Sequence, residues 1–361
     1  MNLLGHRSLA PGILFALTSA LLFGASTPWA KLLLGTVDPW MLAGLLYLGS
    51  GLGLGVLRLG RRLVGVPAAE APLRTADLPW LAGIVLAGGV IGPVLLMVGL
   101  TRTPASAGAL LLNLEGLATM GIAWLVFREN VDRRLLLGAF AILLGAMLLS
   151  WPAGDAGFDV GWGALAIAGA CLAWGIDNNL TRKLSAADPV QIAMVKGLVA
   201  GAVNVLLALF RDSARPPWPA LLCAGVVGLL GYGLSLVLFV LALRHLGTAR
   251  TGAYFSTASF VGAVLAIVMF GDPVTFSLLA AAALMGIGLY LHLAERHEHE
   301  HRHAAMQHEH RHVHDEHHRH AHGPSDPAGE PHTHPHRHAP MVHKHPHYPD
   351  LHHRHSHTQT H

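Results

Sequence analysis

Long apolar runs, separated by short polar breaks, fill the first 293 residues of the chain. Ten of these runs approach the length of roughly 20 residues that an α-helix needs to cross a lipid bilayer. The predicted membrane helices cover residues 11–34, 38–59, 78–101, 104–127, 133–151, 160–183, 188–210, 218–243, 248–270 and 274–293. Two of the breaks carry the dipeptide Asp-Pro, at Asp38-Pro39 and at Asp188-Pro189. The pattern predicts an all-α integral membrane protein with ten transmembrane helices in the bilayer.

The ten predicted helices form two sets of five that resemble each other. The aligned segments are 21–39 with 172–189 and 105–130 with 249–273. Gly24 aligns with Gly175, and Gly108 aligns with Gly252. Because five is an odd number, the second set is predicted to be inverted relative to the first. Inverted repeats are typical of secondary transporters, which bind their substrate near the midplane between the repeats. We expect residues 1–151 and 152–293 to be the two five-helix repeats.

The composition changes abruptly after these repeats. The whole chain is 52% hydrophobic and 12% charged, and 24 of its 27 histidines lie in residues 294–361. This last segment has too few large apolar residues to bury a core, so it is predicted to be a disordered tail.

Basic residues are distributed unevenly between the loops on the two sides of the membrane. If the N-terminus is cytoplasmic, twelve Lys and Arg residues lie inside and four lie outside. Cytoplasmic loops carry the excess of Lys and Arg, so this orientation is favoured, and an even number of helices also places the tail in the cytoplasm. We expect a multi-pass protein of the plasma (inner) membrane. The basic pI near 9.1 is explained by these loops and does not indicate nucleic-acid binding.

Several short motifs resemble those of a known family. One is the run Phe23–Thr27 ending in Lys31, repeated as Trp174-Gly175 ending in Arg182-Lys183. Others are the small-residue start of the fourth helix and the Gly-rich fifth helix, "LLLGAFAILLGAMLL", echoed by "LLAAAALMGIGLYL". With the ten-helix layout, these motifs resemble EamA-type transporters of the drug/metabolite transporter (DMT) superfamily. The resemblance implies a bundle of two five-helix repeats with cytoplasmic termini. It also implies secondary transport, commonly export, of amino acids or other small metabolites.

Glu115 is the first candidate for a functional side chain inside the membrane. It lies 11 residues into the predicted helix 104–127, close to the midplane. Ionisable groups at this depth are costly and are functional candidates for that reason. Glu115 is interpreted either as the carboxylate that couples transport to protons or another ion, or as a structural carboxyl group. Asn113 lies about 200° around the same helix, and helix packing is its favoured role.

The residues Asp177, Asn178 and Asn179 form the most polar patch in any predicted helix. Lys196, on the next helix, lies at a comparable depth from the cytoplasmic end, because the two helices are antiparallel. A buried Asp177–Lys196 pair is therefore predicted. It would stabilise helix packing, or it would open for an amphoteric substrate.

Other candidates lie at helix ends or carry aromatic rings. Lys31 lies near the outer end of the first helix, where it would reach the interface or serve as a binding or gating charge. Trp29, Trp174, Tyr232 and Tyr254 are candidates for the wall of a substrate pocket, with helix packing as the alternative.

The tail alternates histidine with other residues, a pattern suited to binding Ni²⁺, Zn²⁺ or Cu²⁺. The candidate metal ligands are His308, His310, His312, His314, His317, His318, His320 and His322. Metal storage, sensing of metal or pH, and no function at all are open for this segment. The membrane part contains only His6, His245 and His292, all at helix ends or outside the apolar runs. This distribution argues against a metal pathway through the bilayer.

The sequence thus predicts a transporter of a small-molecule substrate that requires no cofactor. A divalent-metal exporter (Ni, Co or Zn) with a metal-capturing tail, and a non-transporting membrane sensor, are the alternatives. No phosphate-binding loop, nucleophile elbow or HExxH motif indicates an enzyme.

Overall fold

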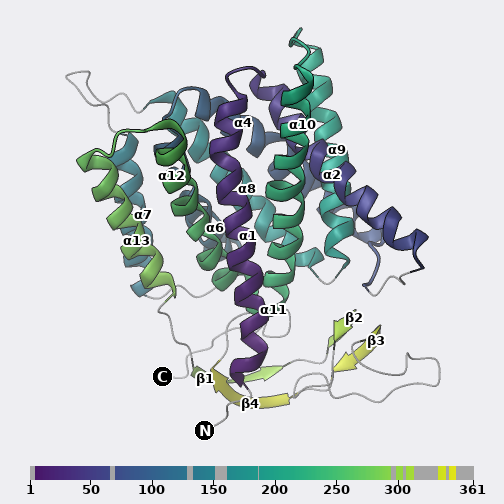
Figure 1. Ribbon diagram of the computed structural model, residues 1–361. Helices are drawn as coiled ribbons and strands as arrows, with labels where there is room; N and C mark the ends of the chain where they lie inside the picture. The colour runs from purple at the N-terminus through teal and green to yellow at the C-terminus, as the bar shows by residue number, and fades with distance from the viewer. Residues whose placement is uncertain are drawn as a thin grey trace.

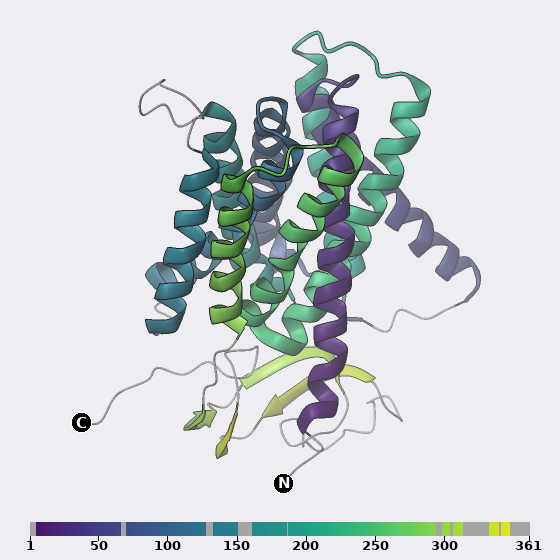
Figure 2. The same ribbon diagram turned by 60° about the vertical axis from the view of Figure 1, so that its left-hand side comes forward.

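The computed structural model describes residues 5–65, 70–127, 133–150, 161–185, 187–293, 298–303, 306–312, 332–338 and 341–346. Its helices form one bundle, and the axes of most of these helices run roughly along the same line (Figures 1 and 2). The first residues of α1 and the last residues of α13 lie at the same end of the bundle (Figure 1). At this end the C-terminal part of α2 diverges from its neighbours in both views.

The helices of the first half are α1 (Gly5–Leu33), α2 (Pro39–Leu63), η1 (Thr75–Asp77), α3 (Leu78–Ile84), η2 (Val85–Ile91), α4 (Gly92–Thr101), α5 (Ala105–Leu111), α6 (Leu114–Phe127) and α7 (Arg133–Ser150). Those of the second half are α8 (Trp162–Leu184), α9 (Pro189–Leu209), α10 (Trp218–Val227), η3 (Gly228–Leu234), α11 (Ser235–Phe255), α12 (Thr257–Phe270) and α13 (Phe276–Leu293). The short η1 is a 3₁₀-helix, whereas η2 and η3 are π-helices.

Eight of the described helical stretches are long and apolar enough to cross a membrane. They correspond to eight of the ten predicted spans. The other two predicted spans correspond to α8, whose polar patch Asp177–Asn179 lowers its hydropathy, and to the shorter apolar helix α13. The prediction of an all-α, multi-pass membrane part is confirmed.

Helix α11 runs through the junction predicted between the eighth and ninth spans. The apolar stretches Trp218–Leu246 and Thr251–Phe270 match these two spans, and α11 continues as a helix from Ser235 to Phe255 across their junction. The segment contains no proline that would remove a backbone donor and end the helix. The interruption comes later, between α11 and α12 at Ser256, and the fourth span has a similar one between α5 and α6.

The two Asp-Pro breaks cap equivalent helices. The Asp38 carboxylate accepts hydrogen bonds from the first backbone N–H groups of α2, and Asp188 does the same for α9. In each helix proline occupies the first position, where its missing N–H costs nothing. Arg58 of α2 also forms an ion pair with Asp188 across 2.7 Å, which connects the two halves.

Equivalent helices of the two halves also pack in equivalent ways. Helix α2 packs against α9 and α7 against α13, whereas α1 packs on α11 and α12 as α8 packs on α4 and α6. Gly24 lies against Ala258, and its aligned partner Gly175 lies against Ala118. A Cβ atom on either glycine would overlap the neighbouring backbone, so small residues permit this close approach. The aligned glycines therefore perform the same packing role in both halves.

The π-helices η2 and η3 lie in the third and the eighth span, which is a further correspondence between the halves. A π-helical turn interrupts the regular α-helical ladder and is frequent at functional sites. In η2 the carbonyl oxygen of Gly88 accepts hydrogen bonds from Tyr47 Oη at 2.5 Å and from Trp174 Nε1 at 3.0 Å. Side chains of neighbouring helices thus satisfy backbone groups in this turn.

The tail contains strands, although it was predicted to be disordered. Strand β1 (Glu298–His303) pairs with β4 (Met341–Pro346), and β2 (Met306–His312) pairs with β3 (His332–His338), both antiparallel. Strand pairing satisfies backbone hydrogen bonds without a large apolar core, which is why the composition alone did not predict it. The predicted ligands His314, His317, His318, His320 and His322 lie outside the described residues.

Candidate functional site

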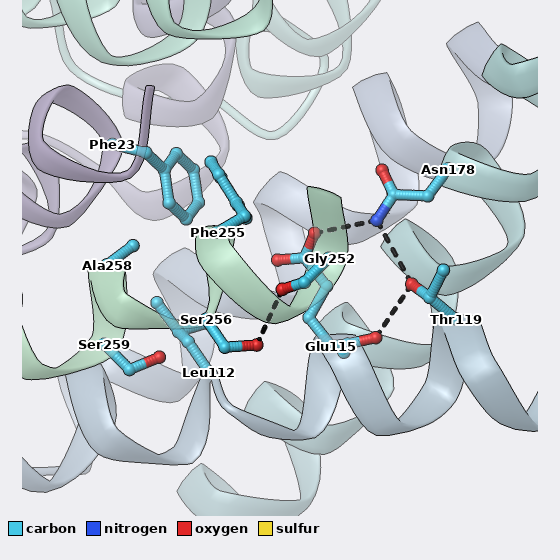
Figure 3. A pocket seen from close by; sticks show the side chains of 11 residues that line it. Phe23, Leu112, Glu115, Thr119, Asn178, Gly252, Phe255, Ser256, Ala258 and Ser259 are labelled. Carbon is cyan, nitrogen blue, oxygen red and sulfur yellow. Dashed lines mark hydrogen bonds between the residues drawn. The ribbon is translucent and has the colours of Figure 1, made fainter. Parts of the chain in front are cut away.

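A cavity of about 50 Å³ lies between the two halves of the bundle. Its polar wall includes Glu115, Asp177, Asn178, Lys196 and Ser235. Its aromatic wall consists of Phe23, Tyr47, Trp174, Tyr232, Phe239 and Phe255. A smaller cavity of about 10 Å³ shares Phe23, Glu115, Asn178 and Phe255, and Ser256 and Ser259 also line it (Figure 3). The larger volume suits one or two water molecules, so a larger ligand requires the helices to move apart.

Glu115 connects the two halves at this site. It lies in the first turn of α6, where the positive end of the helix dipole favours a carboxylate. Its side chain is only 8% exposed, and Oε1 accepts a hydrogen bond of 2.9 Å from Nδ2 of Asn178 on α8. The same Nδ2 donates to Thr119 Oγ1 at 3.2 Å (Figure 3). Glu115 is therefore buried, polar and held by a neutral partner.

Asp177 and Lys196 form a buried ion pair across α8 and α9, as their helix depths predicted. Both residues are 3% exposed. Asp177 Oδ1 also accepts a hydrogen bond of 3.1 Å from Thr181 Oγ1. The carboxylate lies directly against Gly88 of η2, where a Cβ atom would overlap it. The pair thus depends on a glycine in the π-helix.

Four of the predicted site residues meet at the cavity, namely Glu115, Asp177, Asn178 and Lys196. Two of the aromatic candidates, Trp174 and Tyr232, line it as well.

The remaining four predicted site residues lie elsewhere. Asn113 is buried and donates to the carbonyl oxygen of Leu110 at 3.0 Å, as a packing role would require. Trp29 is 43% exposed on α1. Tyr254 packs beside the apolar cluster that contains Ala16. None of the three borders the two cavities.

The side chain of Lys31 forms hydrogen bonds with backbone carbonyl groups at the end of α4, and it borders neither of the two cavities. Its Nζ donates to the carbonyl oxygens of Leu100 and Thr103, the latter at 2.9 Å. A cation is favourable where a helix ends in unpaired carbonyl groups. Lys31 therefore stabilises the turn that follows α4 in the first half.

The cavity residues that sequence reasoning missed include the aromatic Phe23, Tyr47, Phe239 and Phe255 and the hydroxyl-bearing Thr119, Ser235, Ser256 and Ser259. The repeat contained a signal for one of them, because the alignment of Gly24 with Gly175 also aligns Phe23 with Trp174. The two rings meet edge to face, with centroids 5.7 Å apart. The same alignments pair Asp177 with Ser26 and Glu115 with Ser259. Each of these two acidic residues therefore has an uncharged counterpart in the other half.

Potential metal ligands do not gather among the described side chains of the membrane part. No group of three or more His, Cys, Asp or Glu side chains that could hold a metal ion occurs among those the structure describes. His245 packs against the ring of Phe15, and Nε2 of His292 lies 3.2 Å from the carbonyl oxygen of Leu135. The side chains of His6 and of the tail histidines lie outside that description.

Comparison with known proteins shows what the membrane part of the chain is similar to. The model of the EamA-like transporter family matches residues 10–151 and, a second time, residues 161–294. An "uncharacterized transporter" from Methanothermobacter thermautotrophicus is 28% identical over 277 residues, which cover 73% of this chain and 80% of the relative. A crystal structure matches with a TM-score of 0.60 at 23% identity, over 78% of this chain and 94% of the other. This last likeness concerns the fold alone.

Proposed function

The chain belongs to the EamA-like transporter family, and on that premise we propose that it exports small organic metabolites, such as amino acids, by alternating access. Family membership places it in the lipid bilayer with a small-molecule substrate, and not among enzymes. Two matches to one family model support two repeats, which we assign to residues 1–151 and 152–293. The equivalent packing of α1 and α8 supports an inverted arrangement around a central site.

One observation carries the proposal: the buried carboxylate of Glu115 lies at the cavity between the halves. A carboxylate in a low-dielectric environment favours either a proton or a cationic partner. Glu115 accepts a hydrogen bond from Asn178 of the other half, so protonation of its carboxylate changes a contact between the two repeats. We assign Glu115 as the group that couples proton movement to substrate movement.

We also propose that both termini are cytoplasmic. The excess of Lys and Arg supports this orientation, with twelve on one side and four on the other. The first residues of α1 and the last residues of α13 lie at one end of the bundle, as two termini in one compartment require (Figure 1). We assign the histidine-rich tail, residues 294–361, to the same compartment.

The proposal is tested on the full-length protein in liposomes with an imposed pH gradient. Uptake of radiolabelled amino acids and amines identifies a transported compound. Glu115→Gln keeps the size of the side chain and an oxygen that accepts from Asn178, yet cannot exchange a proton at pH 7. We expect it to reduce gradient-driven uptake to the level of empty liposomes. The control is Asp77→Asn, which removes an acid from the η1 turn, outside the cavity.

Undiminished uptake by the Glu115→Gln variant would remove this residue from the mechanism. Absence of flux for every compound of the panel would instead favour a membrane sensor.

A second candidate function concerns the tail. The strand register pairs His308 with His336, His310 with His334 and His312 with His332. Directly opposed and alternate residues of a strand pair share one face, so these positions suit Ni²⁺, Zn²⁺ or Cu²⁺ binding. We propose that the tail binds such ions, either for storage or sensing or as the capturing segment of a metal exporter. The exporter is the weaker alternative, because the described part of the membrane domain contains no ligand cluster.

A further inference from the structure

The cavity contains one carboxylate, that of Glu115, which forms no ion pair with any described basic side chain. Lys196, the cation of this cavity, forms its ion pair with Asp177. Glu115 is bound instead by the neutral amide of Asn178, and no described Lys or Arg pairs with it. With Glu115 ionised, the cavity therefore carries a net negative charge. An unpaired buried charge is costly, so a cationic ligand would be favoured here.

Aromatic rings surround this charge. Phe23 is the central one, with its ring centroid 5.2 Å from that of Phe255 and 5.7 Å from those of Trp174 and Tyr232. Tyr47 continues the group, 5.3 Å from Tyr232. In Figure 3, Phe23 and Phe255 lie on one side of the Glu115 carboxyl group and Asn178 lies on the other. The faces of such rings carry partial negative charge and attract organic cations, most strongly where water is excluded.

We propose that the substrate is an organic cation, a protonated or quaternary amine, whose positive charge lies among these rings beside Glu115. The inference rests on the proposed function and names the substrate class of the same site. The ammonium group would replace the proton on Glu115, so that one carboxylate serves both the substrate and the coupling ion.

Other charge classes fit the cavity less well. An anion would approach Glu115 itself, and its only cationic partner, Lys196, is already bound to Asp177. An amino-acid zwitterion could use Lys196 only by opening this pair, which leaves the buried Asp177 carboxylate without its basic partner. A neutral compound would gain nothing from the charge. The buried pair thus disfavours the carboxylate of a substrate, whereas Glu115 favours an ammonium group.

Binding to the purified full-length protein tests the substrate class by isothermal calorimetry at pH 7.5. The probe is trimethyl(2-phenylethyl)ammonium, which cannot lose its charge. Three compounds with the same ring are compared with it: neutral 2-phenylethanol, anionic phenylacetate and zwitterionic phenylalanine. We expect saturable binding of the quaternary cation, at least about 10-fold tighter than that of the other three.

Two variants locate the bound cation. Glu115→Gln removes the charge, and Phe23→Leu removes the central ring but keeps an apolar side chain. Each is expected to weaken binding of the probe about 10-fold. Phe23→Leu loses a cation–π attraction of about 1–2 kcal/mol, and Glu115→Gln loses the attraction between the cation and the carboxylate. The matched control is Phe15→Leu, whose ring packs against His245 outside the cavity. Size-exclusion chromatography verifies that each variant is folded, and Phe23→Leu tests the site even if Glu115→Gln does not fold.

The possible results separate this inference from the proposed function. Equal or tighter binding of 2-phenylethanol, phenylacetate or phenylalanine would overturn the cationic substrate. Unchanged affinity of the probe for the Phe23→Leu variant would do so as well. If phenylalanine is transported in a manner that depends on Glu115, the proposed transport stands and the cationic class is wrong. If the cation binds as expected but is not moved by a pH gradient, the binding site stands and the proposed transport fails.

Discussion

Nδ2 of Asn178 donates a hydrogen bond of 2.9 Å to Oε1 of Glu115, and the two residues belong to different halves of the chain. Glu115 lies on α6 and Asn178 on α8, where both border the central cavity. Rocking of one half against the other would break this bond or form it again. The contact therefore joins the chemical state of the carboxyl group to the relative position of the two repeats.

Removing this donor should impair transport more than stability. A hydrogen bond to a charged group contributes about 1.5–3 kcal/mol, so we expect Asn178→Ala to reduce the initial rate of gradient-driven uptake about 10-fold. Uptake into liposomes measures the effect. Asn113→Ala is the matched control, because Asn113 is also a buried amide but lies outside the cavity. Equal loss of transport in both variants would mean that Asn178 acts through packing alone.

The Asp177–Lys196 pair should show strong coupling in a double-mutant cycle. Removal of one partner leaves a buried charge and is expected to cost about 3–5 kcal/mol of stability. Asp177→Asn and Lys196→Met should each lower the unfolding temperature in detergent, and the double variant should recover most of the loss. If the double variant also regains transport, the pair is structural. A stable double variant without transport would show that the charges take part in the transport cycle.

Gly88 should tolerate no side chain. A Cβ atom there would overlap the Asp177 carboxylate, so Gly88→Ala must displace the ion pair or the π-helix η2. We expect a loss of at least about 2 kcal/mol in stability, seen as a lower unfolding temperature. The control is Gly60→Ala in α2, where no neighbouring atom lies within 4 Å of the added methyl group. Alanine favours a helix over glycine, so this control should be neutral or slightly stabilising. Similar unfolding temperatures for both variants would contradict the tight fit at Gly88.

Deletion of residues 294–361 should separate metal binding from transport. The truncated chain retains all the described helices, so we expect it to transport the same organic compound at a similar rate. Binding of Ni²⁺ and Zn²⁺, measured by calorimetry, should be lost, because 24 of the 27 histidines are removed. Loss of metal efflux from cells, with the membrane part correctly inserted, would favour the metal exporter over the transporter of organic metabolites.

The sequence alone predicted most of what depends on local composition. Apolar runs placed the membrane helices, since hydropathy is a property of contiguous residues. Asp38 and Asp188 marked two helix starts, because their side chains cap the backbone a few positions further along the chain. The comparable depths of Asp177 and Lys196 predicted their pairing, because helix geometry converts sequence distance into height. The alignment of Gly24 with Gly175 likewise marked two equivalent packing contacts.

Only the tertiary structure decided which side chains share the central cavity. Phe23, Phe239 and Phe255 lie inside predicted membrane helices, where an apolar side chain suits a cavity wall and a lipid-facing surface equally well, so the sequence does not distinguish the two positions. That distinction depends on which helix lies opposite, and long-range packing through small residues sets it. The same packing turned Lys31 toward the end of α4 and brought Asn178 to Glu115. The depth of a residue in the membrane follows from its position along the helix, so the sequence predicts it. Whether its side chain faces a cavity, another helix or lipid depends on the neighbouring helices, so only the tertiary structure decides it.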